Sequence, residues 1–358
     1  MTSFRYPCTG QVKAEGFGAF LEENLGVARG NLLAFTRELD AQFTAPYITL
    51  VNSGSSANLV AALALAEKLR HDNKPLEAVT SAYTFPTTLS ALMMAGFSVR
   101  LVDTEKNGFN MCPAALRRAL NEKAASLVCV THFLGFPAAM DDIMPLARAS
   151  GALVLQDACE TMRLTSSDGQ PMHSLGDMTT WSFYHPHHLS SYGGGAVLAV
   201  SEDDFRLCDS LAHWGRACTC HIDPAACTAP KGFRHNFTYV RPGVNVEMSE
   251  LNAAFGRFQL KNWNDIERRR HQHYAFLYGA LQDVPGVAVY TADPQQGSPF
   301  VFPVRLLDKN AADIVERLAV RGVECRTLMG GAMIEQPAFR HLPHDGNHNA
   351  RATAAASF

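Results

Sequence analysis

The stretch SFYHPHHLSSYGGGAV, residues 182–197, places three histidines within four positions, His185, His187 and His188, between a serine–aromatic pair and a triple glycine. Imidazole ligates metal ions, and with an unperturbed pKa of about 6.5 it also accepts or gives a proton near neutral pH. Three interpretations are therefore open: a metal site, a polar turn without special chemistry, or a catalytic loop in which histidine has replaced another residue.

Two further stretches place polar groups directly after predicted buried strands. In NSGSSAN (52–58) a glycine and two serines precede a predicted helix, and the N–H groups and hydroxyls at a helix N-terminus bind anions such as phosphate. In LVLQDACE, Asp157 ends an apolar strand, where a carboxylate needs a partner and a protonated pyridine nitrogen would supply one. Taken singly, a serine cap without ligand and a capping or salt-bridged aspartate are the simpler explanations.

The elements that must position these residues alternate between short apolar runs and helical patterns. Predicted strands lie within 47–54, 77–85, 98–103, 126–135 and 151–159, and a helix is predicted over 59–69. This alternation predicts a doubly wound α/β domain with a mostly parallel sheet, whose ligands bind at the carboxyl ends of strands. Past residue 255 the pattern changes to a long charged helix over 261–282 and a shorter strand–helix–strand pattern. We therefore predict a large cofactor-binding domain, 1–255, and a smaller α+β domain, 256–358.

Composition narrows the class of protein. The chain has 358 residues, of which 47% are hydrophobic and 18% charged, so it can bury a large core. A formal net charge of −3 gives no general attraction for nucleic acid or an anionic membrane. We see no leader-like segment and no apolar run long enough for a membrane span, and we expect a cytoplasmic enzyme. Nine cysteines argue against a secreted disulfide framework and favour cofactor ligation.

Together, the motifs and their order resemble the DegT/StrS family of sugar aminotransferases and dehydrases, which have the type I aminotransferase-like fold of pyridoxal-phosphate enzymes. The similarity runs from about Gly16 to Phe339. The stretches that carry it are NSGSSAN, AYTF, QDACE, GDMTTWSFYHPHH, GGGAV, GVNVEMSELNAAFG and GVECRTLMGGAMIEQPAF.

The resemblance implies a set of cofactor contacts in this sequence. Phe85 would stack on the pyridine ring, Asp157 would pair the ring nitrogen, and Glu160 falls at a further cofactor-side position. Asn245 would reach the phosphate of a neighbouring subunit, which implies a homodimer with shared active sites. The cofactor phosphate would be held by Gly54, Ser55, Ser56 and Ser182.

The residue five positions after that serine is the Schiff-base lysine in the aminotransferases of this family, but here it is His187. No lysine occurs between Lys123 and Lys231, and imidazole cannot form a Schiff base with an aldehyde. The exchange of lysine for histidine marks the 3-dehydrase branch, which uses pyridoxamine 5′-phosphate to remove a C3 hydroxyl from nucleotide-linked 4-keto-6-deoxyhexoses. In such an enzyme His187 would be the base that acts on the cofactor.

Some dehydrases of that branch carry a [2Fe-2S] cluster on four cysteines. The matching residues here are Cys159 and, in the loop near 216–230, Cys218, Cys220 and Cys227. Their spacing, C-x58-C-x-C-x6-C, differs from that of the relatives by one residue in each longer gap. A tetrahedral zinc site, in which His221 could replace one ligand, is the chemical alternative, and buried structural cysteines are the simplest one.

The resemblance thus predicts C3 deoxygenation of a ketosugar in deoxysugar or antibiotic biosynthesis, with electrons from an external NAD(P)H-dependent or ferredoxin-type reductase. Three departures from the family, Gly193, Ala332 and Glu335, leave the sugar and its nucleotide open. Two alternatives stay open as well. One is a cluster-free dehydratase of the colitose-pathway type, and the other is a non-catalytic pyridoxal-phosphate-binding regulator.

Overall fold

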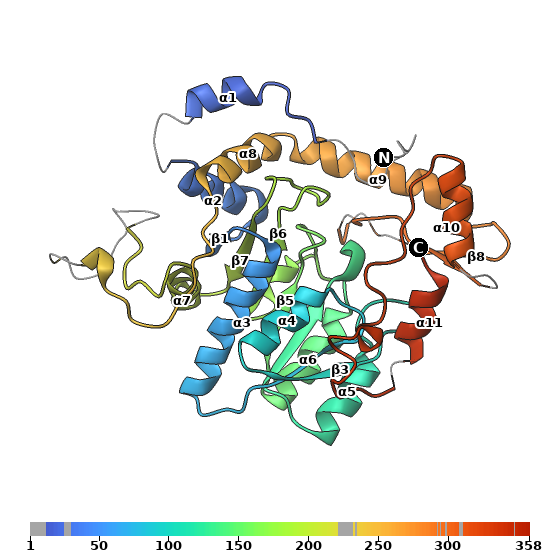
Figure 1. The fold of residues 1–358 in the computed structure, drawn as a ribbon, viewed down its shortest axis with the longest axis horizontal. Helices are drawn as coiled ribbons and strands as arrows, with labels where there is room; N and C mark the ends of the chain where they lie inside the picture. The colour runs from blue at the N-terminus through green and yellow to red at the C-terminus, as the bar shows by residue number, and fades with distance from the viewer. Residues whose placement is uncertain are drawn as a thin grey trace.

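The computed structural model describes residues 12–24, 30–220, 232, 235–291, 293, 295–297, 299–307, 311–346 and 348–358. Its centre is a seven-stranded sheet with helices on both faces (Figure 1). The strands are β1 (Ile48–Val51), β2 (Glu77–Ser81), β3 (Ser98–Val102), β4 (Leu127–Thr131), β5 (Leu153–Asp157), β6 (Met178–Ser182) and β7 (Gly195–Ala199).

The strand order is β1-β7-β6-β5-β4-β2-β3. The neighbours from β6 to β3 all pair in parallel, and β7 pairs antiparallel with both β1 and β6. The helices of this part of the chain are α1 (Phe17–Asn24), α2 (Gly30–Phe43), α3 (Gly54–His71), α4 (Pro86–Met94), α5 (Pro113–Glu122), α6 (Met140–Ser150) and α7 (Glu202–Ala212). Helices α4, α5 and α6 follow β2, β3 and β4, whereas the connection from β5 to β6 contains only the 3-10 turn η2 (Met172–Ser174).

The central strands β4, β5 and β6 are buried at nearly every position because both faces of the sheet are covered. In β4, Leu127 and Cys129 join the core beneath α3 and α4, while Val128 and Val130 join the core on the opposite face, which includes α5 and α6. Successive side chains of a strand point to opposite faces, so one strand supplies both cores. The prediction of an α/β fold with a large, mostly parallel sheet is confirmed.

The C-terminal part of the chain begins with two helices that run across the top of Figure 1, α8 (Glu250–Leu260) and α9 (Trp263–Leu281). A two-stranded antiparallel sheet, β8 (Val287–Val289) with β9 (Val304–Leu306), follows beside α10 (Ala311–Val320) and α11 (His348–Ala356). The predicted domain boundary at 255/256 lies inside α8, and the division into two domains stays a prediction. Within the described ranges, no helix is long and apolar enough to cross a membrane.

Helix α3 is central to the fold because it packs on β6, β7, α4 and α7, and it lies in the middle of Figure 1. Ser53 caps its N-terminus by accepting a hydrogen bond from the Ser56 N–H at 3.0 Å. Its buried side is built of alanines and leucines, so it can lie close to the sheet. The helix therefore directs its N-terminus toward the carboxyl ends of the strands.

Replacing one leucine of this helix tests its role in the core. Leu65 is fully buried, so we expect Leu65→Ala to lower the free energy of unfolding by about 2–5 kcal/mol through lost burial and the cavity left behind. Urea denaturation followed by circular dichroism measures the change. The matched control is Val320→Ala, because Val320 is 90% exposed and its loss should change stability by less than about 0.5 kcal/mol. Equal effects of the two substitutions would contradict the assignment of α3 to the core.

Candidate active site

The N-terminus of α3 forms a polar cradle after β1. The Ser55 hydroxyl donates to Thr87 Oγ1 at 3.0 Å, and the Ser56 hydroxyl donates to Asn52 Oδ1 at 2.6 Å. Positive partial charge and free N–H groups gather at the N-terminus of a helix, which favours an anion there. The fold thus places Gly54, Ser55 and Ser56 at the N-terminus of a helix, and phosphate binding by them stays a prediction.

Gly54 brings three predicted site residues into contact. A Cβ atom added at Gly54 would lie 2.6 Å from Ser182 Cβ and 2.9 Å from Cys159 Sγ. Any larger residue would therefore push α3 away from the ends of β5 and β6. The glycine is required here by close approach, and this contact joins the phosphate cradle to the strand ends.

Asp157 is a buried carboxylate at the end of β5, with 3% of its surface exposed. Its Oδ2 atom accepts hydrogen bonds from Asn58 Nδ2 at 2.8 Å and from the Thr88 hydroxyl at 2.5 Å. Its Oδ1 atom accepts from the Cys159 N–H at 3.1 Å. These donors are all neutral, and no described side chain forms an ion pair with Asp157. A buried carboxylate in this setting is suited to a cationic ligand group, because burying a charge without a counter-charge is unfavourable.

Glu160 lies one turn farther on and is buried with its carboxylate turned to the loop after β4. The Leu134 N–H donates to Glu160 Oε2, and Leu134 adopts a left-handed φ of 57° in that loop. Burial raises the pKa of Glu160 to about 8, against the opposing hydrogen bond from Leu134. The carboxyl group is therefore largely protonated at neutral pH, and it can donate a hydrogen bond as well as accept one.

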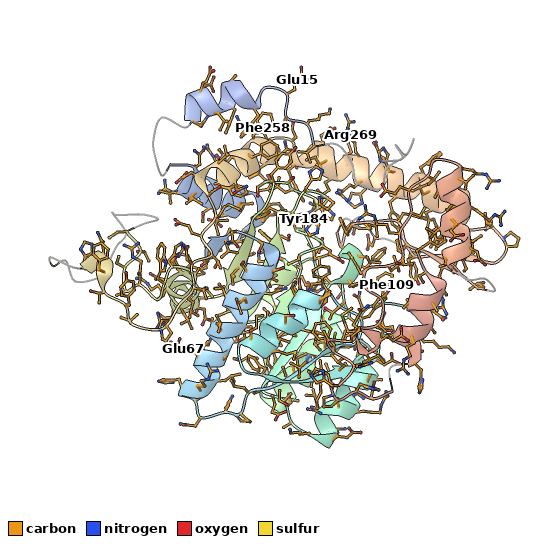
Figure 2. All side chains as sticks on the ribbon, in the orientation of Figure 1. Glu15, Glu67, Phe109, Tyr184, Phe258 and Arg269 are labelled. Carbon is orange, nitrogen blue, oxygen red and sulfur yellow. The ribbon has the colours of Figure 1, made fainter. Side chains whose placement is uncertain are left out.

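His187 lies in the loop after β6, half-buried against aromatic rings. Its ring meets the ring of Phe300 edge-on at 5.0 Å and the ring of Tyr184 edge-on at 5.8 Å. Burial lowers its pKa to about 4, and the positive charge of Arg270 adds to that effect. The imidazole is therefore neutral at physiological pH, which is the state in which histidine acts as a base. Figure 2 labels Tyr184 in the central part of the molecule, below α9.

The other two histidines of the loop have different surroundings. His188 is buried near Trp263, with ring centroids 6.4 Å apart, and it helps to anchor the loop on α9. His185 stacks on Tyr192 at 5.4 Å with the ring planes 10° apart. The structure therefore separates the three imidazoles into different packing environments, and among the described residues they do not form a metal-ligating group.

Two predicted cofactor contacts lie at the surface of this single chain. Phe85 precedes α4 and is 45% exposed, which is unusual for a large apolar side chain in a loop that borders the sheet. Asn245 is exposed and forms a β-bridge with His213. Exposure leaves both side chains able to meet a ligand or a second subunit.

The structure brings together two of the four predicted cluster cysteines. Cys218 and Cys220 lie near His235, while Cys159 belongs to the Asp157 group instead. Burial and the charge of Asp157 raise the pKa of the Cys159 thiol well above its usual range. Cys227 lies outside the described residues, so the four-cysteine set stays a prediction.

The three residues that depart from the family pattern, Gly193, Ala332 and Glu335, lie in different surroundings. Gly193 has a φ of +125°, a conformation that residues with a side chain rarely adopt. Ala332 is fully buried, and the Met333 N–H donates to the carbonyl of Ala82 at 2.8 Å. Glu335 lies at the surface, 3.6 Å from Arg351. Only the first of these positions belongs to the histidine loop.

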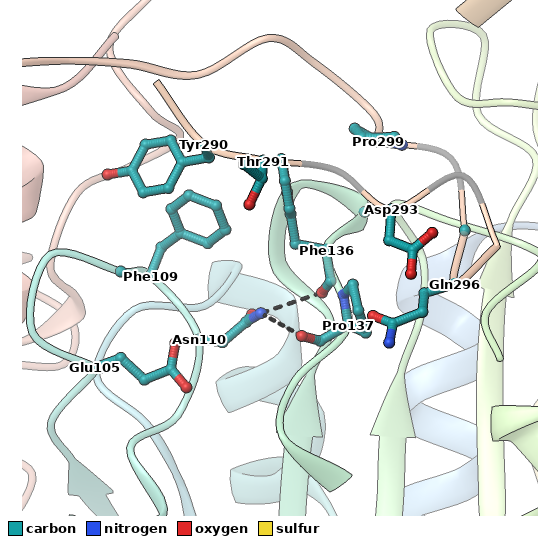
Figure 3. A pocket seen from close by; sticks show the side chains of 13 residues that line it. Glu105, Phe109, Asn110, Phe136, Pro137, Tyr290, Thr291, Asp293, Gln296 and Pro299 are labelled. Atoms are coloured by element: carbon teal, nitrogen blue, oxygen red, sulfur yellow. Dashed lines mark hydrogen bonds between the residues drawn. The ribbon is translucent and has the colours of Figure 1, made fainter. Parts of the chain in front are cut away.

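A separate cleft of about 280 Å³ lies where the loops after β3 and β4 meet the segment that follows β8 (Figure 3). Phe109 and Tyr290 form one wall, with ring centroids 4.8 Å apart. Asn110 donates to the carbonyls of Phe136 and Pro137, each at 3.1 Å, and so fixes the opposite wall. None of the predicted site residues lines this cleft, which makes it a neighbour of the candidate site and not part of it.

Three residues that sequence reasoning did not single out complete the site. Asn58 and Thr88 orient the Asp157 carboxylate. Asn58 could have been found, because it lies one helical turn after Gly54 and thus on the same side of α3. Arg270, on α9, donates to the carbonyl of Phe300 at 3.0 Å and to that of His187 at 3.4 Å. No local signal in the sequence points to this arginine.

This arrangement of fold and site defines a type I pyridoxal-phosphate architecture. The chain matches the DegT/DnrJ/EryC1/StrS aminotransferase family over residues 12–357 and belongs to that family. The predicted membership is thereby confirmed.

Several relatives of the chain are named as sugar 3-dehydratases. It is 31% identical to the dTDP-4-dehydro-2,6-dideoxy-D-glucose 3-dehydratase of Saccharopolyspora spinosa, over 88% of this chain and 71% of the relative. It is 26% identical to the GDP-4-keto-6-deoxy-D-mannose 3-dehydratase of Yersinia pseudotuberculosis, over 88% of this chain and 81% of the relative. The solved structure of E. coli GDP-4-keto-6-deoxy-D-mannose-3-dehydratase with bound hydrated PLP has the same fold. The TM-score is 0.86 at 21% identity, over 99% of this chain and 94% of the other.

The protonated state of Glu160 predicts a specific pH dependence of stability. A carboxyl group whose pKa is raised on folding stabilises the protein at low pH. That contribution is lost as the pH rises from about 4.5, where the unfolded group ionises, to about 8. Glutamine does not ionise and still offers an oxygen to the Leu134 N–H, so we expect Glu160→Gln to abolish this fall in stability with rising pH. Each pKa unit between folded and unfolded states corresponds to about 1.4 kcal/mol.

Thermal melting at pH 5 and pH 8 measures the effect. The wild-type midpoint should fall relative to that of Glu160→Gln as the pH is raised. Glu335→Gln is the control, because that carboxylate is at the surface and its removal should leave the wild-type trend in place. Parallel pH curves for wild type and Glu160→Gln would show that Glu160 is ionised in the folded protein.

Proposed function

We propose that the protein is a pyridoxamine-phosphate-dependent 3-dehydratase that removes the C3 hydroxyl of a nucleotide-linked 4-keto-6-deoxyhexose. One arrangement carries the proposal: the loop after β6 holds a neutral histidine, His187, at the same sheet edge as the buried carboxylate of Asp157, which has no ion-pair partner among the described side chains. By the resemblance to the family's aminotransferases, His187 takes the position of their Schiff-base lysine. His187 can transfer a proton but cannot form a Schiff base, and Asp157 can pair with a protonated pyridine nitrogen.

The residues present fit the cofactor. The α3 N-terminus offers Gly54, Ser55 and Ser56 to a phosphate, and Gly54 has no side chain to obstruct its approach. Asp157 has neutral donors on both carboxylate oxygens, so it can accept a charged N–H from the pyridine ring. The exposed ring of Phe85 is available to stack on that pyridine. Ser182, next to Gly54, would add a hydroxyl to the phosphate cradle.

Bound pyridoxamine phosphate supplies an amine that condenses with a ketone and a pyridine ring that withdraws electrons. Around it, each side chain has a separate task. Asp157 holds a proton on the pyridine nitrogen, and Asn58 and Thr88 keep that carboxylate in place. His187, neutral because burial lowers its pKa to about 4, accepts a proton from the C4′ carbon. Glu160, protonated near neutral pH, supports the site without adding a second negative charge beside Asp157.

The relatives named as 3-dehydratases support the substrate class. Their names give a dTDP-linked and a GDP-linked 4-ketosugar as substrates, and both sugars offer a C4 ketone next to a C3 position.

Net deoxygenation at C3 requires electrons. The C3–O bond breaks and the hydroxyl takes one proton to leave as water, while two electrons and a second proton form the new C3–H bond. We propose that an external NAD(P)H-dependent or ferredoxin-type reductase supplies the electrons through a [2Fe-2S] cluster, and the proximity of Cys218 and Cys220 supports a metal centre on this chain.

A second subunit would complete the site. Large aromatic side chains on the site loops are exposed in the single chain: Phe85 is 45%, Tyr184 61% and Tyr192 58% exposed. Exposed apolar surface of this kind marks an interface more often than free solvent-facing surface. We propose a homodimer in which Asn245 reaches the cofactor phosphate bound by its partner.

A cluster-free dehydratase is the second candidate. The observation that favours it is that Cys159 lies beside Asp157 and not with Cys218 and Cys220. Such an enzyme would release its product by hydrolysis without a reductase. The two electrons would come from the cofactor amine, which would be oxidised to the aldehyde and would then be restored by an amino donor. The visible spectrum of anaerobically purified protein, recorded before and after dithionite, separates the candidates because only a cluster gives a bleachable absorption.

Replacing the proposed base tests the mechanism. We expect His187→Asn to abolish dehydration, because an amide cannot accept a proton at neutral pH, while the cofactor still binds through α3 and Asp157. Product analysis and the absorbance of bound cofactor measure the two effects separately. His185→Asn is the matched control, since His185 stacks on Tyr192 in the same loop, and it should retain most of the activity. Turnover by His187→Asn at the wild-type rate would refute the assignment.

Replacing a cysteine tests the reductive step. We expect Cys218→Ser to lose the iron–sulfur spectrum and to stop product release after dehydration, while proton exchange at C4′ continues. Iron and sulfide analysis, together with exchange of solvent deuterium into the cofactor, distinguishes these outcomes. Cys112→Ser is the control, because Cys112 lies at the start of α5, away from the metal-ligating group, and it should behave as wild type. Full deoxygenation by Cys218→Ser would exclude a cluster on this residue.

A further inference from the structure

The segment between α7 and α8 gathers a compact group of metal-ligating atoms. The ligand atoms of Cys218, Cys220 and His235 all lie within 4.8 Å of one another. The closest pair is Cys220 Sγ and His235 Nε2, at 3.4 Å. Among the described residues, no other group of histidine, cysteine and acidic side chains meets this condition.

Backbone pairing explains why these residues meet although fifteen or more positions separate them. Arg216 forms an antiparallel bridge with Tyr239, and the Ala217 N–H donates to the carbonyl of Thr238 at 2.9 Å. The chain on either side of this pairing therefore runs as two facing segments. Cys218 and Cys220 continue one segment, and the 3-10 turn η3 (His235–Phe237) precedes the other. The group is thus held by hydrogen-bonded backbone and not by chance contact of loose side chains.

The imidazole of His235 is oriented as a ligand would be. Its Nδ1 atom lies 3.3 Å from the carbonyl of Gly232, and since a carbonyl only accepts, Nδ1 carries the proton. The Nε2 lone pair then faces the thiols. A backbone carbonyl that fixes the tautomer in this way is the usual outer partner of a metal-bound histidine. Cys218, which is buried, contacts Asn236 at 3.6 Å, so its position is fixed as well.

Of the other two cysteines of the sequence pattern, Cys227 lies outside the described residues and Cys159 lies elsewhere in the fold. Cys159 follows β5 at the centre of the molecule, with its sulfur 3.9 Å from the Thr180 hydroxyl. In Figure 1 the yellow turn η3 lies at the left-hand edge, beyond α7, whereas β5 lies near the middle. Cys159 is therefore not part of the group that Cys218, Cys220 and His235 form.

We propose that His235 is a metal ligand, together with Cys218 and Cys220, and that it takes the role that the sequence pattern assigns to Cys159. Two thiolates and an imidazole suit iron in an iron–sulfur cluster and suit zinc. The ligand assignment deepens the proposed function, but it concerns metal binding alone and is tested without measuring turnover.

The experiment compares the metal content of anaerobically purified full-length variants. Iron, acid-labile sulfide and zinc are measured in wild type, His235→Ala, His235→Cys, Cys159→Ser and His341→Ala. The protein is also reconstituted with ferrous iron and sulfide, and its absorption and electron paramagnetic resonance spectra are recorded. Circular dichroism of each variant checks that the fold is retained.

We expect His235→Ala to contain at least about tenfold less bound metal than wild type. Removing an outer hydrogen-bond partner of a ligand already lowers metal affinity by about 10–100-fold, and removing the ligand itself should lower it at least as much. His235→Cys should retain metal and change the spectrum, since a thiolate replaces a nitrogen. Cys159→Ser and the exposed control His341→Ala should bind metal as wild type does.

The outcomes separate the ligand assignment from the proposed function. Zinc in place of iron, lost in His235→Ala, supports the ligand assignment and contradicts electron transfer through a cluster. Wild-type protein without metal, or full metal content in His235→Ala, overturns the assignment. If metal is lost in Cys159→Ser but kept in His235→Ala, the ligands are the four cysteines of the sequence pattern and His235 is not one of them.

Discussion

The candidate site depends on one buried negative charge, the carboxylate of Asp157. It ends β5, the middle strand of the sheet, where burial in the core removes most of its hydration. Asn58 of α3 and Thr88 of α4 supply neutral hydrogen bonds to it. Two helices must therefore converge on one strand end to keep the carboxylate oriented, and this convergence also fixes the α3 N-terminus beside β6. The phosphate cradle and the proposed pairing with the pyridine nitrogen thus rest on the same packing.

The burial that isolates Asp157 also sets the charge states of its neighbours. Glu160 and His187 both favour their neutral forms, because a low-dielectric setting disfavours ionised carboxyl and imidazolium groups alike. The outcome is a site with one fixed negative charge flanked by an acid and a base that are both uncharged near neutral pH. Such an arrangement suits proton transfer at carbon, because the neutral imidazole can accept a proton while the fixed carboxylate can hold a cationic group nearby.

The sequence alone predicts a large part of this arrangement, for definite physical reasons. Apolar strands buried on both faces and a serine-capped helix leave clear local patterns, so the sheet, α3 and the strand-end position of Asp157 were predicted correctly. Contacts between distant segments leave no such pattern. The hydrogen bonds from Asn58 and Thr88 depend on the angles at which α3 and α4 meet the sheet. The hydrogen bonds that Arg270 donates to the histidine loop depend on the position of α9. The family resemblance groups Cys159 with Cys218 as cluster ligands, which stays a prediction, and the fold places Cys159 against Gly54.

Arg270 has one more implication. Its guanidinium is shared between the backbone of the histidine loop, at Pro186 and His187, and the backbone at Phe300, in the connection between β8 and β9. Burial lowers the pKa of Arg270 to about 10, so it remains charged and its bonds to these carbonyls persist at physiological pH. The proposed base is therefore mechanically coupled to the C-terminal part of the chain. A tilt of α9 would therefore move the histidine loop and Phe300 together, and the position of the proposed base depends on the angle of this helix.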